Sequence, residues 1–168
     1  MGQLRALASK RVRETPVDSD VGRLKFLVQG FASTFGLLVT KQTPCGLPIS
    51  PSHAHCLMVL LERDREAVET TQSDLGERLG INKSNVARLC SKLQRDGHAL
   101  QVRSPDDGRE RVVSLTAKGR RMGERLEVAS DERFGRILKA VAPAARQPVL
   151  ASLATLIEAV RVLDGDVK

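Results

Sequence analysis

Polar side chains suited to reading DNA lie at helical spacing between residues 83 and 92. Arginine can bind the edge of a guanine, asparagine the edge of an adenine, and serine either a base or a phosphate oxygen. Apolar residues recur every three or four positions in the same segment, so a helix here would bury one face and expose the other. The apolar face consists of Val86, Leu89, Cys90 and Leu93. The polar face consists of Lys83, Ser84, Asn85, Arg88 and Lys92.

A second, shorter helix is expected immediately before this segment. Thr71 and Asp74 form a capping-box variant, with a short side-chain oxygen at the N-cap and a carboxylate in the first turn. Gly80 supplies the positive φ that ends a helix, and Asn82 can cap the helix that follows. The order of helix, tight turn and helix is typical of a helix-turn-helix, whose second helix enters the major groove of DNA.

Basic residues and turn formers follow the second helix. Residues 98–103 and 110–115 have the character of extended strands, and the segment between them is rich in turn residues. We therefore predict a two-stranded hairpin, or wing, made basic by Arg103, Arg109 and Arg111. An arginine near a hairpin tip suits the narrow and strongly negative minor groove of DNA.

Several sequence signatures occur in order between residues 71 and 119. They are Leu75 to Leu79 followed by Gly80-Ile81, then Lys83-Ser84-Asn85-Val86, then Asp107-x-Arg109, and last Leu115-Thr116-x-x-Gly119. In this order they resemble the winged helix-turn-helix of the MarR (multiple antibiotic resistance regulator) family, and the resemblance extends over about residues 20 to 165. It implies that Arg109 enters the minor groove and that Asp107 braces the wing. Gly108 departs from the family pattern, in which many members carry a second basic residue there, and this weakens the expected wing contact.

The helix-turn-helix and the wing together supply the expected DNA-binding surface. Its residues are Thr71, Gln72, Ser73, Lys83, Ser84, Asn85, Arg88, Lys92, Arg103, Asp107, Arg109 and Arg111. The chain carries a net charge of +7, and residues 71–122 hold eleven Lys or Arg against six Asp or Glu. Positive charge clustered in this way favours a polyanionic partner, although charge alone would also fit a merely soluble basic surface.

The fold expected from these elements is mainly α-helical with a small two- or three-stranded β wing. We assign residues 49–119 to the winged helix-turn-helix, and residues 20–48 together with 120–168 to a helical dimerisation region. Residues 1–19 form a basic N-terminal arm, which either is mobile or contacts phosphates or a partner subunit. The flanking helices are expected over residues 21 to about 41, from Ser50 onwards, 116 to about 141, and about 143 to 163.

Apolar residues recur along the first and last of these helices. In the last helix they step by four, three, four and three residues, which is typical of a coiled-coil seam, although a helix buried in its own core can show the same pattern. In proteins of the MarR family the first and last helices of two subunits interlock, so the resemblance implies a homodimer. The interface residues expected are Leu24, Leu27, Val149, Leu153, Leu156, Val160 and Leu163.

Thiol and imidazole side chains gather around Ser50. Cys45, His53, His55 and Cys56 include the ligands that zinc and copper prefer, but their spacing matches no recognised metal signature, and local packing and hydrogen bonding are the alternative. A partly exposed thiolate could also sense an oxidant. No resident metal or cofactor is therefore expected. An effector pocket is expected around Phe31, Phe35, His53 and Cys56.

The function expected is sequence-specific binding of double-stranded DNA by a transcriptional regulator. The resemblance implies a homodimeric repressor that a small molecule releases from a palindromic operator. The alternatives are a weakly specific architectural DNA-binding protein and a regulator that responds to metal or oxidant through the cysteines and histidines. An enzyme is not expected, because no orienting group or substrate cleft accompanies the thiols. With no signal-peptide pattern, no apolar run long enough to span a membrane and three cysteines, the protein is expected in the cytoplasm.

Overall fold

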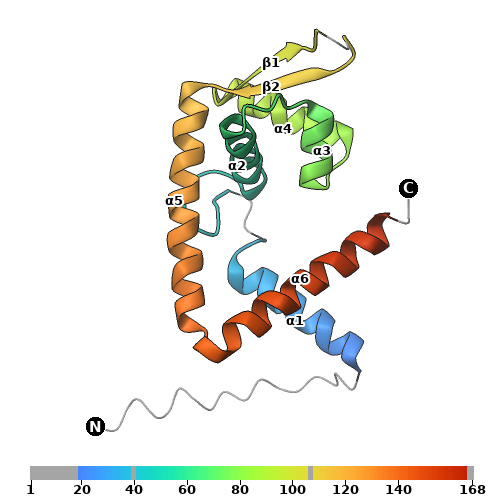
Figure 1. The fold of residues 1–168 in the computed structure, drawn as a ribbon, viewed down its shortest axis with the longest axis vertical. Coiled ribbons are helices and arrows are strands. Elements are labelled where there is room, and N and C mark those ends of the chain that lie inside the picture. The colour runs from blue at the N-terminus through green and yellow to red at the C-terminus, as the bar shows by residue number, and fades with distance from the viewer. Residues whose placement is uncertain (1–18, 39–40, 106–107, 166–168) are drawn as a thin grey trace.

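The DNA-reading elements predicted from the sequence lie at one end of the protein, and the first helix and much of the last helix lie toward the other end (Figure 1). The computed structural model describes residues 19–38, 41–105 and 108–165, and these residues form six helices and one two-stranded sheet. In chain order the elements are α1 (Asp20–Phe35), α2 (Pro51–Arg65), α3 (Gln72–Leu79), α4 (Lys83–Arg95), β1 (Ala99–Arg103), β2 (Arg111–Leu115), α5 (Ala117–Ala140) and α6 (Pro143–Gly165). The predicted fold class, mainly α-helical with a small β wing, is confirmed.

Local hydrogen bonds at the helix ends produce the helix-turn-helix. The hydroxyl of Thr71 accepts from the backbone N–H of Asp74 at 3.1 Å, and the Asp74 carboxylate accepts from the backbone N–H of Thr71 at 2.8 Å. Gly80 ends α3 with a φ of 63°, and the side chain of Asn82 accepts from the N–H of Asn85 at the start of α4. These caps satisfy backbone groups that a helix leaves unpaired at its ends. The predicted caps and the turn between them are confirmed.

α2 lies at the centre of the core because it packs against α5 on one side and against α3, α4 and β2 on others. Helical spacing in the sequence selects only Ala54, Leu57, Met58 and Leu61 as its apolar stripe. The structure also buries Cys56, Val59 and Leu60. A helix enclosed on several sides is apolar around most of its circumference, so the sequence pattern underestimates how much of α2 is buried.

The apolar face of α4 closes the same core. Its residues Val86, Leu89, Cys90 and Leu93 are all buried, as predicted. Neighbouring elements contribute Leu75, Ala99, Val113 and Leu126. Burying one leucine side chain stabilises a fold by about 1.5 to 3 kcal/mol, so this face holds α4 firmly in one orientation.

The wing is a short antiparallel hairpin whose two strands pair along five residues each. The sequence analysis placed His98 and Glu110 in these strands, and the structure places both outside them. The backbone N–H of His98 instead donates to the carbonyl of Leu93 at 2.8 Å, which completes the end of α4. An isolated bridge between Thr71 and Val112 joins the wing to the start of α3.

α1 is shorter than the apolar pattern of the sequence suggests. The prediction of a helix up to about residue 41 is wrong, since α1 ends at Phe35. Gly36 adopts a φ of 88°, and the N–H of Leu37 donates to the carbonyl of Ala32 at 3.0 Å. This is the hydrogen-bond pattern by which a left-handed glycine stops a helix.

α1 and α6 have no buried residue among their described side chains. The two helices overlap in the view of Figure 1, at the end of the protein away from the wing. Their exposed apolar residues include Leu24, Leu27, Val28, Phe31, Val149, Leu150, Leu153, Ile157, Val160 and Leu163. Exposed apolar surface of this extent is typical of a contact with another surface.

Gly119 allows the first turn of α5 to pack on the backbone of His98. A β-carbon at residue 119 would collide with the carbonyl oxygen of His98, so Gly119→Ala should lower the free energy of unfolding by about 3 kcal/mol. Gly135 lies in the same helix with no described atom close to its β position, and Gly135→Ala should raise that free energy by about 1 kcal/mol through helix propensity. Urea unfolding measures both values. Equal effects of the two substitutions would contradict the packing argument.

Candidate nucleic-acid interface

The polar face of α4 is exposed at the end of the protein that carries the wing (Figure 1). Its exposed residues are Lys83, Ser84, Asn85, Arg88 and Lys92. Lys92 forms an ion pair with Asp96 at 3.1 Å, and the Ser84 hydroxyl donates to the Asn82 side chain at 2.9 Å. Exposed ion pairs of this kind add little stability, so Lys92 can exchange Asp96 for a phosphate. The side chains able to read bases therefore lie on the surface.

The predicted contact residues at the start of α3 are engaged in hydrogen bonds within the protein. Thr71 caps the helix, the Gln72 amide donates to Gln101 at 2.5 Å, and the Ser73 hydroxyl donates to Glu110 at 2.7 Å. The bonds of Gln72 and Ser73 join α3 to Gln101 of β1 and to Glu110, the residue directly before β2. The geometry therefore gives Gln72 and Ser73 a role in holding α3 to the wing, which the sequence analysis did not anticipate.

The arginines of the wing cluster near its turn. Arg103 and Arg111 are register partners at the end of the hairpin, and both are exposed, as is Arg109. Like charges directly opposite each other across an antiparallel pair destabilise it, and an anion between them would relieve the repulsion. Asp107, expected to brace the wing, lies outside the described residues.

Two buried histidines lie close to the same charged side chains at the end of α4. Burial lowers the pKa of both His53 and His98; Lys92 lowers the pKa of His53 further, and Lys118 that of His98. The hydrogen bond from Lys92 in turn lowers the pKa of Asp96. Both ring nitrogens of His98 are buried and have no hydrogen-bond partner among the described residues. His98 directly follows Gly97, which comes after the end of α4. The sequence analysis interpreted this histidine only as the start of a strand and did not predict its burial beside Lys118 and Asp96.

The cysteine and histidine candidates are dispersed. Cys56 is fully buried, and a hydrogen bond with the Cys90 thiol, together with burial, raises the pKa of Cys56, which makes it a poor thiolate ligand or nucleophile. Cys45 instead lies 3.0 Å from the Thr43 hydroxyl, and His55 is exposed on α2. Across residues 19–38, 41–105 and 108–165, no three His, Cys, Asp or Glu side chains form a group that could hold a metal ion.

The residues predicted for an effector pocket fall into two places. Phe31 and Phe35 stack at a centroid distance of 5.1 Å, and Phe134 of α5 lies 5.4 Å from Phe35. The Arg133 guanidinium lies 5.1 Å above the Phe35 ring and donates to the Phe35 carbonyl at 3.2 Å. His53 and Cys56 belong instead to the core of the winged helix. The structure therefore adds two α5 residues to the aromatic cluster that the sequence analysis did not assign to a pocket.

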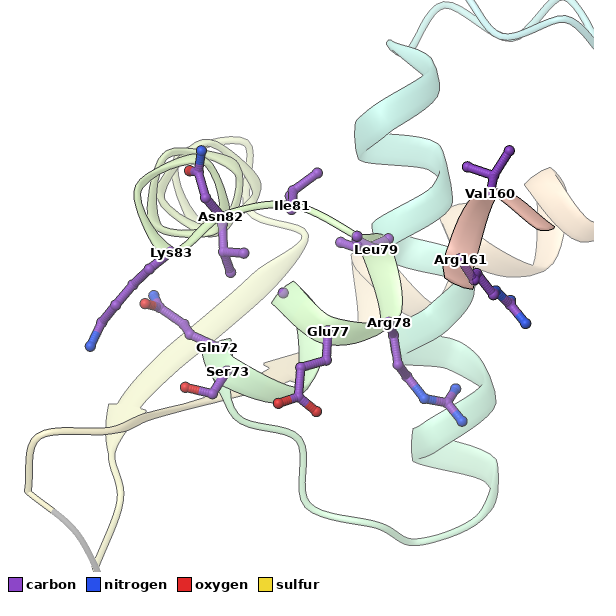
Figure 2. A pocket seen from close by; sticks show the side chains of 13 residues that line it. Gln72, Ser73, Glu77, Arg78, Leu79, Ile81, Asn82, Lys83, Val160 and Arg161 are labelled. Carbon is purple, nitrogen blue, oxygen red and sulfur yellow. The ribbon is translucent and has the colours of Figure 1, made fainter. Parts of the chain in front are cut away.

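The C-terminal part of α6 lies opposite the helix-turn-helix (Figure 1). An open groove of about 810 Å³ lies between them. Figure 2 shows Leu79 and Ile81 on the side of the helix-turn-helix and Val160 and Arg161 on α6. Val160, predicted for a subunit interface, therefore also lies beside the reading elements.

A helix-turn-helix with an exposed polar second helix and a basic wing defines a winged helix-turn-helix protein. Residues 47–110 match the model of the MarR family. The HTH-type transcriptional regulator YdgJ of Bacillus subtilis (strain 168) is 30% identical over 115 residues, which are 68% of this chain and 63% of YdgJ. The chain thus spans less than two thirds of the length of this relative.

Among the described helices, none combines the length and the apolar character needed to cross a lipid bilayer.

Solved structures share the fold over most of the chain. PcaV from Streptomyces coelicolor, determined with its natural ligand, is 26% identical with a TM-score of 0.62, covering 84% of this chain and 93% of PcaV. The S. aureus MepR–DNA complex is similar in fold, with 16% identity, a TM-score of 0.64, and coverage of 84% of this chain and 99% of MepR. The chain belongs to the MarR family, and the relatives it matches are named as regulators of transcription.

Acid should destabilise this protein through its buried histidines. The folded state holds the pKa of His53 and of His98 below the value of about 6.5 that a free histidine has. The unfolded state therefore binds more protons, so stability that is complete above a pH of about 6.5 should decrease as the pH falls below it. Urea unfolding from about pH 8 to about pH 5 measures this decrease. His98→Gln should flatten it, and His55→Gln at an exposed site is the matched control; an unchanged profile for His98→Gln would contradict the argument.

Proposed function

We propose that this regulator binds an inverted-repeat operator in double-stranded DNA as a homodimer and represses transcription until a small-molecule effector releases it. One observation carries the proposal: the exposed polar face of α4 and the arginines of the wing lie at the same end of the protein (Figure 1). This arrangement supports α4 entering the major groove while the wing reaches the adjacent minor groove. Lys83, Ser84, Asn85 and Arg88 would then face bases and phosphates.

The helical end of the protein supports a homodimer. α1 and α6 expose apolar residues along their length and have no buried residue among the described side chains. A second copy of the chain would cover this surface and place two α4 helices on one duplex. Two-fold related helices read two half-sites separated by about one duplex turn, roughly 34 Å.

The DNA and the ligand named for similar proteins support the proposals of DNA binding and of release by an effector. MepR has been determined in complex with DNA, and PcaV in complex with its natural ligand. For this chain we place the effector beside Phe31 and Phe35, at the junction of α1 with α5, where an aromatic cluster and Arg133 are already present. An effector can bind more tightly to a dimer in which the two α4 helices are differently spaced. It then weakens operator binding by at most the difference between its binding free energies for the two states of the dimer.

Selection of binding sites from random DNA tests the proposal. The expected result is an inverted repeat with half-sites about one turn apart and an affinity about 10³-fold or more above that for random duplex at the same salt concentration. A ratio below about tenfold would instead identify an architectural DNA-binding protein. Adding candidate effectors to the bound complex then tests release.

The arginines of α4 and of the wing should contribute differently to operator binding. Arg88→Ala should weaken binding by about 1 to 3 kcal/mol and relax the preference at one base step, because a bidentate base contact is lost. Arg109→Ala should weaken binding mainly through the minor groove. Fluorescence anisotropy with the selected operator measures both. Arg136→Ala on α5 removes the same charge from an exposed site in the other half of the protein and is the control; unchanged affinity for both Arg88→Ala and Arg109→Ala would refute the assigned contacts.

A charge in the exposed apolar surface of α6 should separate the subunits. Leu153→Asp should convert the dimer into a monomer and reduce operator affinity at least about 100-fold, because a buried unpaired carboxylate costs several kcal/mol and one half-site contact is lost. Analytical ultracentrifugation and anisotropy measure the two effects. Val128→Asp, at an exposed apolar site on α5, is the control for the added charge. A Leu153→Asp protein that stays dimeric would show that this face of α6 is not the interface.

A further inference from the structure

Residues Thr70 to Ser73, which lead into and begin α3, are joined to the wing by three connections. These join segments that are about 30 to 40 residues apart in the chain. They are the backbone bridge between Thr71 and Val112, which includes the hydrogen bond from the Val113 N–H to the Thr70 carbonyl at 2.8 Å, and two side-chain bonds, from the Gln72 amide to Gln101 at 2.5 Å and from the Ser73 hydroxyl to Glu110 at 2.7 Å. α3 and the wing are therefore positioned as one unit.

Gln101 extends this unit to α4. Its side-chain carbonyl Oε1 accepts from Gln72 Nε2 at 2.5 Å, and its own Nε2 donates to Gln94 Oε1 at 2.7 Å. One partly buried amide of β1 thus joins α3 to the last turns of α4. Gln101 faces the same side of the hairpin as the buried Ala99, whereas Leu100 and Val102 face outward and are exposed.

We infer that Gln101 is a positioning residue for DNA recognition, whose amide fixes the wing relative to α4 so that both can enter their grooves at the same time. The inference rests on the proposed function and extends it to a residue outside the expected contact set. α4 and the wing bind DNA together only if their relative position matches the distance between neighbouring grooves. Without the hydrogen-bonded amides the wing keeps its backbone connections and its apolar contacts with α4, but it loses its side-chain hydrogen bond to that helix.

The hydrogen bonds of Gln101 predict an effect on the preference for the operator over random DNA. Gln101 uses both its carbonyl and its amino group within the protein, and so it acts through Gln94 and Gln72 on the residues that read DNA. Binding to random DNA depends mainly on phosphate charge and tolerates a shifted wing. Binding to the operator requires base contacts and wing contacts in one register. Loss of Gln101 should therefore weaken operator binding and leave random binding almost unchanged.

The experiment compares Gln101→Met with the wild-type protein as full-length chains. Methionine keeps the length of the side chain and removes both hydrogen bonds. Affinity for the selected operator should fall about tenfold, because the wing is no longer held in register and must be ordered when the protein binds, while affinity for random duplex at the same salt concentration should stay within about twofold. Val102→Met, on the outward face of the same strand, is the matched control and should match the wild type in both affinities. Loss of the two hydrogen bonds should lower the melting temperature of Gln101→Met by a few degrees at most relative to Val102→Met, so both variants stay folded in the binding assay.

A glutamate at the same position tests positioning by rescue. In Gln101→Glu the carboxylate can accept from Gln72 and, once the Gln94 amide has turned over, from Gln94 as well. The hydrogen bonds to Gln72 and Gln94 are then restored, but the variant carries an added negative charge. The affinities for the operator and for random duplex should therefore fall together, and their ratio should stay within about threefold of the wild-type ratio. Gln94→Met removes the link to α4 from an exposed position and should reproduce the loss of specificity seen in Gln101→Met.

Two outcomes would overturn the inference. One is an unchanged ratio of operator to random affinity in Gln101→Met; if both affinities fall equally, the role of Gln101 is purely structural. The other is a loss of the ratio in Gln101→Glu as large as in Gln101→Met, which indicates direct contact with DNA. A wild-type protein without sequence preference would instead refute the proposed function itself. The two failures are therefore distinguished by the wild-type measurement.

Discussion

Burial of the apolar face of α4 in the core that it shares with α2, α3 and the wing is the contact on which the arrangement of the winged helix depends. Val86, Cys90 and Leu93 are almost completely enclosed, and exposing such side chains costs about 1.5 to 3 kcal/mol each for the larger ones. That cost fixes the rotation of α4 about its own axis, because any other rotation would bring valine and leucine into water. The polar residues of α4 must then lie outside. The reading face is a consequence of the core, and it does not require a ligand to form it.

Local chemistry determines the parts of this arrangement that could be predicted from the sequence. The caps at Thr71 and Asn82 and the stop at Gly80 depend on hydrogen bonds within three or four residues, which a short sequence pattern contains. Burial of α2 on several sides and the place of His98 depend on elements distant in the chain, about which helical spacing is silent. The candidate site divides in the same way. The exposed face of α4 was predictable, whereas the chain through Gln101 was not, because its three amides come from three elements.

The winged helix buries most of its apolar residues, whereas α1 and α6 expose most of theirs. The winged helix buries them within one chain, and its core includes residues from α2, α3, α4, α5 and the wing. α1 and α6 leave theirs in water, with Leu27 exposed by 56% and Leu163 by 68%. A helix pair of this kind gains its stabilisation when another surface covers it. Its geometry is therefore open to influence by a partner or ligand in a way that the geometry of the winged helix is not.

α5 is the element through which a change at the helical end reaches the DNA-binding end. It has 24 residues and spans about 36 Å, so a rotation of about 10° moves one end by about 6 Å relative to the other. Near the wing it is fixed to α2 by the buried Leu126 and the close approach of Gly123; at the far end Arg133 binds the carbonyl of Phe35, which ties α5 to α1. A ligand at that junction needs only different affinities for two orientations of α5 and no contact with the reading residues. Because residues Thr70 to Ser73 join α3 to the wing, the winged helix responds as one body, and in the proposed dimer the quantity open to change is the distance between two such bodies on the duplex.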